Sequence, residues 1–131
     1  MGRYQYHPHT ADEKFSVEAE TLEDGFETAH KALVGIMTDS EFDLDLQTEI
    51  QLTGTPERLL YDFLNEIITR LDEEYVLYME SSVKIEGNTL KAVLKGCDAD
   101  NILFRTVIKN MTYSEMKVEL DPVRLEVVVD I

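Results

Sequence analysis

The residues that could do chemistry gather first in the stretch HPHTADEKF at positions 7–15. On a strand, positions i and i+2 share a face, so His7 and His9 could present two imidazoles to one zinc ion, with Asp12 as a third ligand. Pro8 lies between them and has no N–H to donate, which favours a strand end or an edge position. The sequence holds only three histidines and one cysteine, so this stretch predicts an incomplete zinc site, and a polar turn between two strands is the alternative.

A second candidate lies at the other end of the sequence, RLEVVVDI. The valines at 127–129 predict a strand that is buried on both faces, and Asp130 follows them directly. If Ile131 is the true end of the chain, its terminal carboxylate lies beside Asp130, and neighbouring anions repel each other unless a cation neutralises them. Oxygen ligands of this kind suit Ca²⁺ or Mg²⁺ better than zinc. A solvated strand end is the alternative interpretation.

The third candidate is Lys109 in the stretch VIKNMTY, which has the composition of a strand. Val107 and Met111 share its face, so the lysine would lie at a sheet edge or in a cleft, unless it is simply solvated. Elsewhere no serine or threonine sits in a sharp glycine-flanked turn, and no glycine-rich loop could hold a phosphate. Composition and spacing therefore point to no enzyme.

Charge is the strongest signal in the composition, because 12 Lys and Arg residues stand against 27 Asp and Glu residues, a formal net charge of −15. Contacts with nucleic-acid phosphates depend on Lys and Arg, so we expect no direct nucleic-acid binding. The balance favours a basic protein partner or hard cations held by carboxylates, with solubility alone as the alternative.

The length of 131 residues and the hydrophobic fraction of 44% predict one domain that covers 1–131. No apolar run reaches the ~18 residues of a membrane span, and no basic-then-apolar leader precedes the first strand. Cys97 has no partner for an internal disulfide and lies among acids in KGCDAD, which indicates an inert thiol in a reducing compartment. We therefore expect a cytoplasmic protein without a membrane contact.

The elements that must position these residues follow from hydrophobic periodicity. Two stretches have helical spacing, 21–37 with Thr21 as the N-cap and 55–74 with Pro56 at its first turn, and His30 is expected to flank the apolar face of the first helix. Alternation or β-rich composition predicts strands at 3–7, 14–20, 42–54, 75–80, 82–87, 89–96, 105–113, 116–120 and 123–131. This order predicts an α+β domain with two helices packed on a mainly antiparallel β-sheet.

Several of these stretches together resemble the archease family. Five motifs occur in the family's order over nearly the whole chain: HTAD, TLEDGFETA, LLYDFLNEII, IKNMTYSEM and the final DI. The resemblance implies a compact α+β fold and a non-catalytic cofactor of the tRNA-splicing RNA ligase, which promotes guanylylation of the ligase and its multiple turnover. It also implies an alternative, a chaperone-like module for RNA-modifying enzymes such as a tRNA methyltransferase.

The same resemblance assigns site residues by position. The divalent-metal ligand of the family's HTAD motif falls on Asp12, its terminal aspartate on Asp130 and its last oxygen ligand on Ile131. The family's functional lysine falls on Lys109, and His9 belongs to the same HTAD motif as a residue for partner contact or function. The implied ion is Ca²⁺, with Mg²⁺ or Mn²⁺ as alternatives.

The chain departs from the family pattern at two positions. Ser114 stands where many members have histidine, so the role of that histidine is absent here. Cys97 stands where many members have glutamate after glycine, so the resemblance gives weaker support for an acid at that position. Neither residue belongs to the implied metal ligands.

Overall fold

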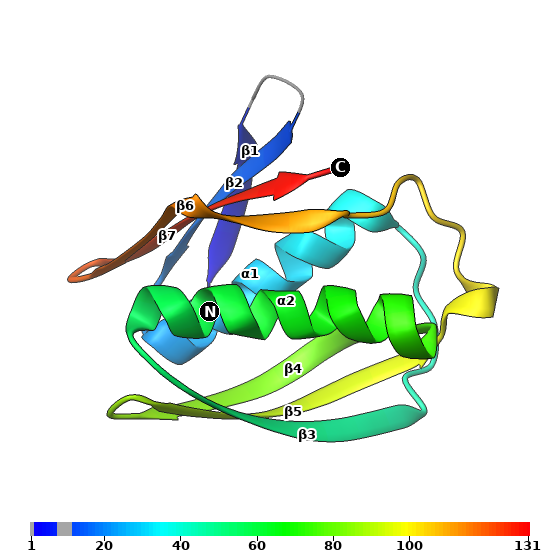
Figure 1. Cartoon of the computed structure of the whole chain (residues 1–131), viewed down its shortest axis with the longest axis horizontal. Helices are drawn as coiled ribbons and strands as arrows, with labels where there is room; N and C mark the ends of the chain where they lie inside the picture. Colours follow the sequence, from blue (N-terminus) through cyan, green and yellow to red (C-terminus); the bar gives the residue numbers. More distant parts are fainter. Residues whose placement is uncertain (1, 8–11) are drawn as a thin grey trace.

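A computed structural model describes residues 2–7 and 12–131 of the chain. Figure 1 shows three layers, in which two helices lie between a four-stranded and a three-stranded sheet. The four-stranded sheet has the strand order β1-β2-β7-β6, the three-stranded sheet has the order β3-β5-β4, and every described pairing is antiparallel. The elements are β1 (Arg3–His7), β2 (Asp12–Ala19), α1 (Leu22–Met37), β3 (Leu46–Thr53), α2 (Pro56–Glu74), β4 (Val76–Glu86), β5 (Thr89–Asp98), a short 3-10 helix (Ala99–Asn101), β6 (Asn110–Leu120) and β7 (Val123–Asp130).

The α+β class with two helices is confirmed, but the strands form two sheets rather than one. Each helix therefore buries more than one face. Helix α1 packs on β4 of one sheet and on β1, β2 and β7 of the other, and α2 packs on β3 and β4 on one side and β6 on the other. None of the described helices is long and apolar enough to cross a membrane.

The helix ends agree with the capping signals in the sequence. The hydroxyl of Thr21 accepts a hydrogen bond from the Asp24 N–H at 3.1 Å, and the hydroxyl of Thr55 accepts one from the Arg58 N–H at 3.4 Å. Each bond satisfies one of the N–H groups that the first turn leaves without a partner. Helix α2 ends where Tyr75 adopts a left-handed conformation with φ of 55°.

The predicted starts of two strands were wrong by several residues, whereas the strands expected at 14–20 and 89–96 differ by no more than two residues at either end. The strand expected at 42–54 begins only at Leu46, which pairs with Gly96, because β5 beyond Gly96 pairs with β4 alone. The strand expected at 105–113 begins only at Asn110. Asn110 is opposite Asp130, the last residue of β7, so the residues before Asn110 have no β7 residue to pair with.

Two pairs of predicted strands are single strands with irregularities. The stretches 75–80 and 82–87 fall in β4, whose register shifts between Tyr78 and Glu80. The end of 105–113 and the stretch 116–120 fall in β6, whose register shifts between Thr112 and Lys117. Extra residues at such bulges interrupt the alternation of side chains, which is why the sequence pattern looked like two separate strands.

The expectation for His30 was also wrong. The residue does not flank the apolar face but is fully buried, because α1 is covered by both sheets. The largest fully buried side chains of the described residues belong to both helices and both sheets, among them Phe15, Phe26, Phe63, Leu77 and Leu94.

Candidate functional site

The structure brings together two acids from opposite ends of the chain. Strand β2 pairs with β7, and in that register Asp12 is the direct partner of Asp130. Directly opposite residues of an antiparallel pair have Cβ atoms ~4.5–5.5 Å apart and point to the same face. Both aspartates are half-buried. The two carboxylates are thus neighbours at one end of the four-stranded sheet.

The alternation along the two strands determines which face carries the acids. Phe15 is opposite Val127 and Val17 is opposite Leu125, and all four are fully buried toward the helices. Asp12 and Asp130 have the other parity, so their side chains lie on the outer face of the sheet.

Two other predicted site residues, Lys109 and Ile131, lie next to this pair. The backbone N–H of Lys109 donates to the carbonyl oxygen of Asp130 at 2.7 Å, and the residue is exposed. Ile131 follows Asp130 and its half-buried side chain packs against the core. His9 lies outside the described residues.

The surroundings of the two acids are polar. The Lys14 amine, next to Asp12 on the same face, is 3.3 Å from the Glu126 carboxylate. His7 is on the same face, and its Nε2 is 2.7 Å from the Ser16 hydroxyl. No group of three or more His, Cys, Asp and Glu side chains converges within residues 2–7 and 12–131.

A buried polar group that the sequence did not reveal links α1 to β4. His30 Nε2 lies 2.7 Å from the Tyr78 carbonyl oxygen, and Nδ1 lies 2.9 Å from the Ser81 hydroxyl. Burial lowers the pKa of the His30 imidazole to about 4, although the bond to Tyr78 acts in the opposite direction. The group is therefore neutral at physiological pH, and its only sequence signal was a polar residue one step from an apolar stripe.

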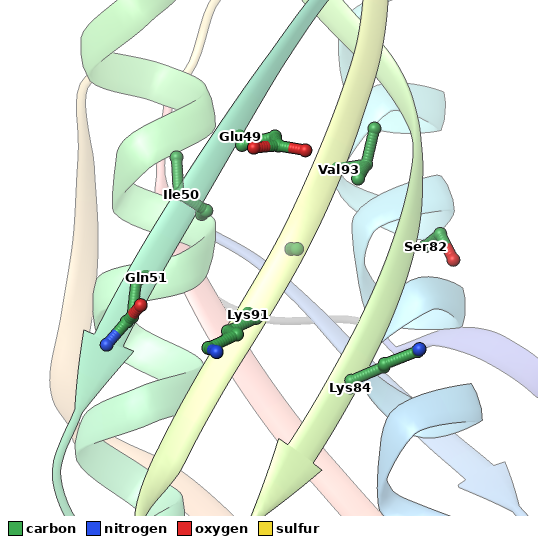
Figure 2. Close-up of a pocket in the computed structure, with 8 residues that line it drawn as sticks. Glu49, Ile50, Gln51, Ser82, Lys84, Lys91 and Val93 are labelled. Carbon is green, nitrogen blue, oxygen red and sulfur yellow. The ribbon is translucent and has the colours of Figure 1, made fainter.

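The outer face of the three-stranded sheet carries another feature that the sequence did not reveal, a hollow of about 500 Å³. Figure 2 shows its lining residues from β3, β4 and β5. Lys84 and Lys91 are direct cross-strand partners there, and their side chains extend in different directions (Figure 2). The signal was the alternation of lysines in VKIEGNTLKAVLK, which becomes a pair only once the hairpin register is known.

Cys97 is buried, as an inert thiol should be. Burial raises the pKa of its thiol, and the nearby carboxylates of Asp45 and Asp98 act in the same direction. A protonated thiol is a poor nucleophile and a poor metal ligand.

The structure is a small three-layer α+β domain with a pair of carboxylates at a strand end. Comparison with known proteins identifies the family of such domains to which it belongs. The profile of the Archease protein family matches residues 4–131. The chain belongs to the archease family.

Individual relatives agree with this assignment. The chain is 37% identical over 133 residues to the protein archease of Methanopyrus kandleri, covering 94% of this chain and 95% of the relative. It is 32% identical over 122 residues to that of Sulfolobus acidocaldarius, covering 88% of each.

Two solved structures share the fold. The solution structure of a Methanobacterium thermoautotrophicum protein has a TM-score of 0.74 at 22% identity and covers 98% of each chain. The crystal structure of a Thermotoga maritima protein, described as an archease and possible chaperone, has a TM-score of 0.66 at 22% identity and covers 97% of this chain and 96% of the other.

Proposed function

We propose that this protein is a non-catalytic activator of the RNA ligase that acts in tRNA splicing, and that it promotes guanylylation of the ligase and its multiple turnover. The observation that carries the proposal is the direct pairing of Asp12 with Asp130 on the outer face of the sheet. Family membership supports it, and the archease resemblance assigns the metal ligands to these two positions. Two serine–histidine contacts occur among the described residues, and in each of them one partner, Ser16 or His30, is buried. An auxiliary role therefore fits better than catalysis.

The donor set fits a hard divalent cation, with Ca²⁺ the first choice and Mg²⁺ or Mn²⁺ as alternatives. Asp12 and Asp130 offer carboxylate oxygens, and an oxygen of Ile131 is adjacent. Ca²⁺ takes ~6–8 oxygen ligands, so the remaining positions belong to water or to groups of the partner. When bound, the ion would neutralise the two carboxylates and offer open positions to that partner.

Charge and exposure suit contact with a basic enzyme. The net charge of −15 would steer the chain toward an RNA-binding protein and raise the association rate, more at low salt than at high salt. The exposed Lys109, held next to Asp130 by its backbone bond, is the cation that we expect to reach the partner at this end of the sheet.

The test is to mix the purified protein with its cognate ligase and measure guanylylation and turnover. We expect Asp12→Asn and Asp130→Asn each to reduce the stimulation about tenfold or more, because ligands of one ion act as a unit. Asp43→Asn is the matched control, since Asp43 is exposed outside the sheets and loses the same charge. Stimulation that is absent in the native protein, or unchanged in both site variants, would contradict the proposal.

A chaperone-like role is the second candidate, favoured by the description of the Thermotoga maritima protein as a possible chaperone. In this role the chain would bind and stabilise an RNA-modifying enzyme such as a tRNA methyltransferase, in the cytoplasm. Suppressed aggregation of that enzyme, equal in native protein and Asp130→Asn, would assign the chain to this role and separate it from ligase activation.

A further inference from the structure

The two edges of the three-stranded sheet differ in how their backbone groups are satisfied. On β4, helix α1 covers the edge. The N–H of Val83 donates to the Glu27 carboxylate at 2.8 Å, and His30 Nε2 lies 2.7 Å from the Tyr78 carbonyl oxygen. These side chains occupy backbone groups that would otherwise be free to pair with another strand.

The other edge is β3, and the register identifies which of its backbone groups point outward. Just beyond β3, the Gly54 N–H donates to the Asn88 carbonyl oxygen at 2.9 Å, so this pair is hydrogen-bonded. The register between β3 and β5 shows no shift, so hydrogen-bonded and non-bonded pairs alternate along it. The N–H and C=O groups of the non-bonded residues therefore face away from β5. These residues are Gln47, Glu49, Gln51 and Thr53.

The covered edge provides an independent check of this assignment. If alternate residues of β5 bond to β3, the residues between them bond to β4, and Val83, the partner of Ala92, must point outward from β4. Its N–H does point outward, to Glu27.

The β3 edge lacks the features that usually protect an edge strand. All eight residues of β3 are described, and they include no lysine, no proline and no bulge, with Glu49 as the one charged residue at the centre. No hydrogen bond from a described residue reaches the outward groups of the four residues, and Figure 2 shows Glu49 and Gln51 on the outermost strand of the sheet.

We propose that the β3 edge binds an extended segment of a partner protein as an added antiparallel or parallel strand, and that this segment carries a basic side chain opposite Glu49, because Gln47 and Gln51 on either side already face Lys95 and Lys91 of β5. Main-chain hydrogen bonds would supply affinity, and alternate side chains would supply specificity. A residue opposite Glu49 lies on the same outer face, so Lys or Arg fits there. On the other face the added strand meets Leu46, which is 37% exposed, so its alternate residues are apolar.

Charge argues against a second copy of this chain as the occupant. Pairing β3 with β3 of another copy puts two Glu49 residues on one short ladder and brings together two molecules of charge −15 each. Glu49 thus repels a second copy of this chain and attracts a basic residue on the added strand. Both effects contribute to the specificity of the edge. The β3 edge lies on the opposite sheet from Asp12 and Asp130, so the proposal does not depend on ligase activation.

Amide hydrogen exchange tests the proposal on the native protein. The probe is a capped synthetic peptide of alternating threonine and valine with one central lysine in place of a threonine. In the free protein we expect fast exchange at Gln47, Glu49, Gln51 and Thr53 and slow exchange at the residues between them. The peptide should slow the four exposed amides about tenfold or more and leave Val83 unchanged. Four amides that are already protected in the free protein, or that the peptide does not protect, would overturn the proposal.

A proline substitution separates strand pairing from charge attraction. Gln51→Pro removes an outward N–H without changing the charge or a bond to β5, and we expect it to weaken peptide binding roughly fivefold to tenfold. Gln51→Ala keeps the N–H and should bind like the native protein. Gln47→Pro, near the strand end, serves the same purpose if Gln51→Pro does not fold.

The outcomes distinguish the possible occupants. Equal binding by the proline and alanine variants would mean that only charge attracts the peptide, and the proposal fails. A native dimer in which the same four amides are protected would assign the edge to a second copy instead, which also overturns it.

Discussion

Each sheet of this protein carries a pair of like charges directly opposite each other on its outer face. In the four-stranded sheet the pair is Asp12 and Asp130, and in the three-stranded sheet it is Lys84 and Lys91. Like charges at such positions destabilise a sheet. The two pairs share this geometry but differ in side-chain length and exposure.

Those differences decide what each pair can do. Lys84 and Lys91 are exposed, and their long side chains extend in different directions, so water screens the amines (Figure 2). The aspartates are half-buried and short, so their carboxylates cannot move apart in the same way. A bound cation would therefore change the energy of the carboxylate pair much more than an anion would change that of the lysine pair.

His30 is a more extreme case than the aspartates, because its side chain is held in place and has no access to solvent. It is fully buried, with both ring nitrogens within hydrogen-bond distance of protein atoms. We expect His30→Ala to lower the free energy of unfolding by about 2–4 kcal/mol, because it leaves a cavity and an unsatisfied Tyr78 carbonyl. Urea unfolding measures this, with the exposed neighbour Lys31→Ala as control. If His30→Ala loses no more stability than Lys31→Ala, the burial of His30 does not determine the cost of its substitution.

The free energy of unfolding should also depend on pH because His30 is buried. Burial lowers the pKa of His30 from 6.5 to about 4, so the unfolded state binds a proton that the folded state does not between these values. The contribution to stability is fully present above pH 6.5 and is lost as the pH falls toward 4, by on the order of 3 kcal/mol in all. Urea unfolding across this range should show a steeper loss in native protein than in His30→Gln. If the stability of the two proteins changes with pH in parallel, the pH dependence does not come from His30.

The carboxylate pair should respond to divalent ions rather than to burial. In native protein, Ca²⁺ at about a hundred times its dissociation constant would add about 2.7 kcal/mol to the free energy of unfolding. Asp130→Asn should lose most of this gain, because one of the two ligands becomes neutral, whereas Asp43→Asn should keep it. Unfolding with and without Ca²⁺, Mg²⁺ and Mn²⁺ measures the effect. An equal gain in Asp130→Asn would remove the proposed metal site.

The sequence predicted those parts of the fold that depend on local signals. The helices follow Thr21, Thr55 and Pro56, whose capping chemistry is visible without any tertiary contact. The pairing of Asp12 with Asp130 is a long-range fact that no spacing contains. It was expected only because the archease resemblance assigned both positions to one site.

Other features could not be predicted from the sequence because they depend on how the helices and sheets stack on one another. A helix between two sheets keeps only a narrow solvent-facing side, so a polar residue such as His30 becomes buried although its position in the helical pattern suggests a flank. Likewise, the lysine pair needs the β4–β5 register, and the open β3 edge needs the strand order. Periodicity indicates the face of an element but not what covers that face.

The smallest expected effect comes from Lys84→Gln, and it tests the comparison directly. Removing one of two exposed amines should raise the free energy of unfolding by at most about 0.5 kcal/mol, and salt should abolish the gain by screening. Metal-free Asp130→Asn should gain more, up to about 1 kcal/mol, and keep more of it in salt because its carboxylate is half-buried. Urea unfolding of both variants at low and high salt measures the difference. If both gain equally and both gains vanish in salt, side-chain length and burial do not distinguish the two pairs, and the carboxylates have no special need of a cation.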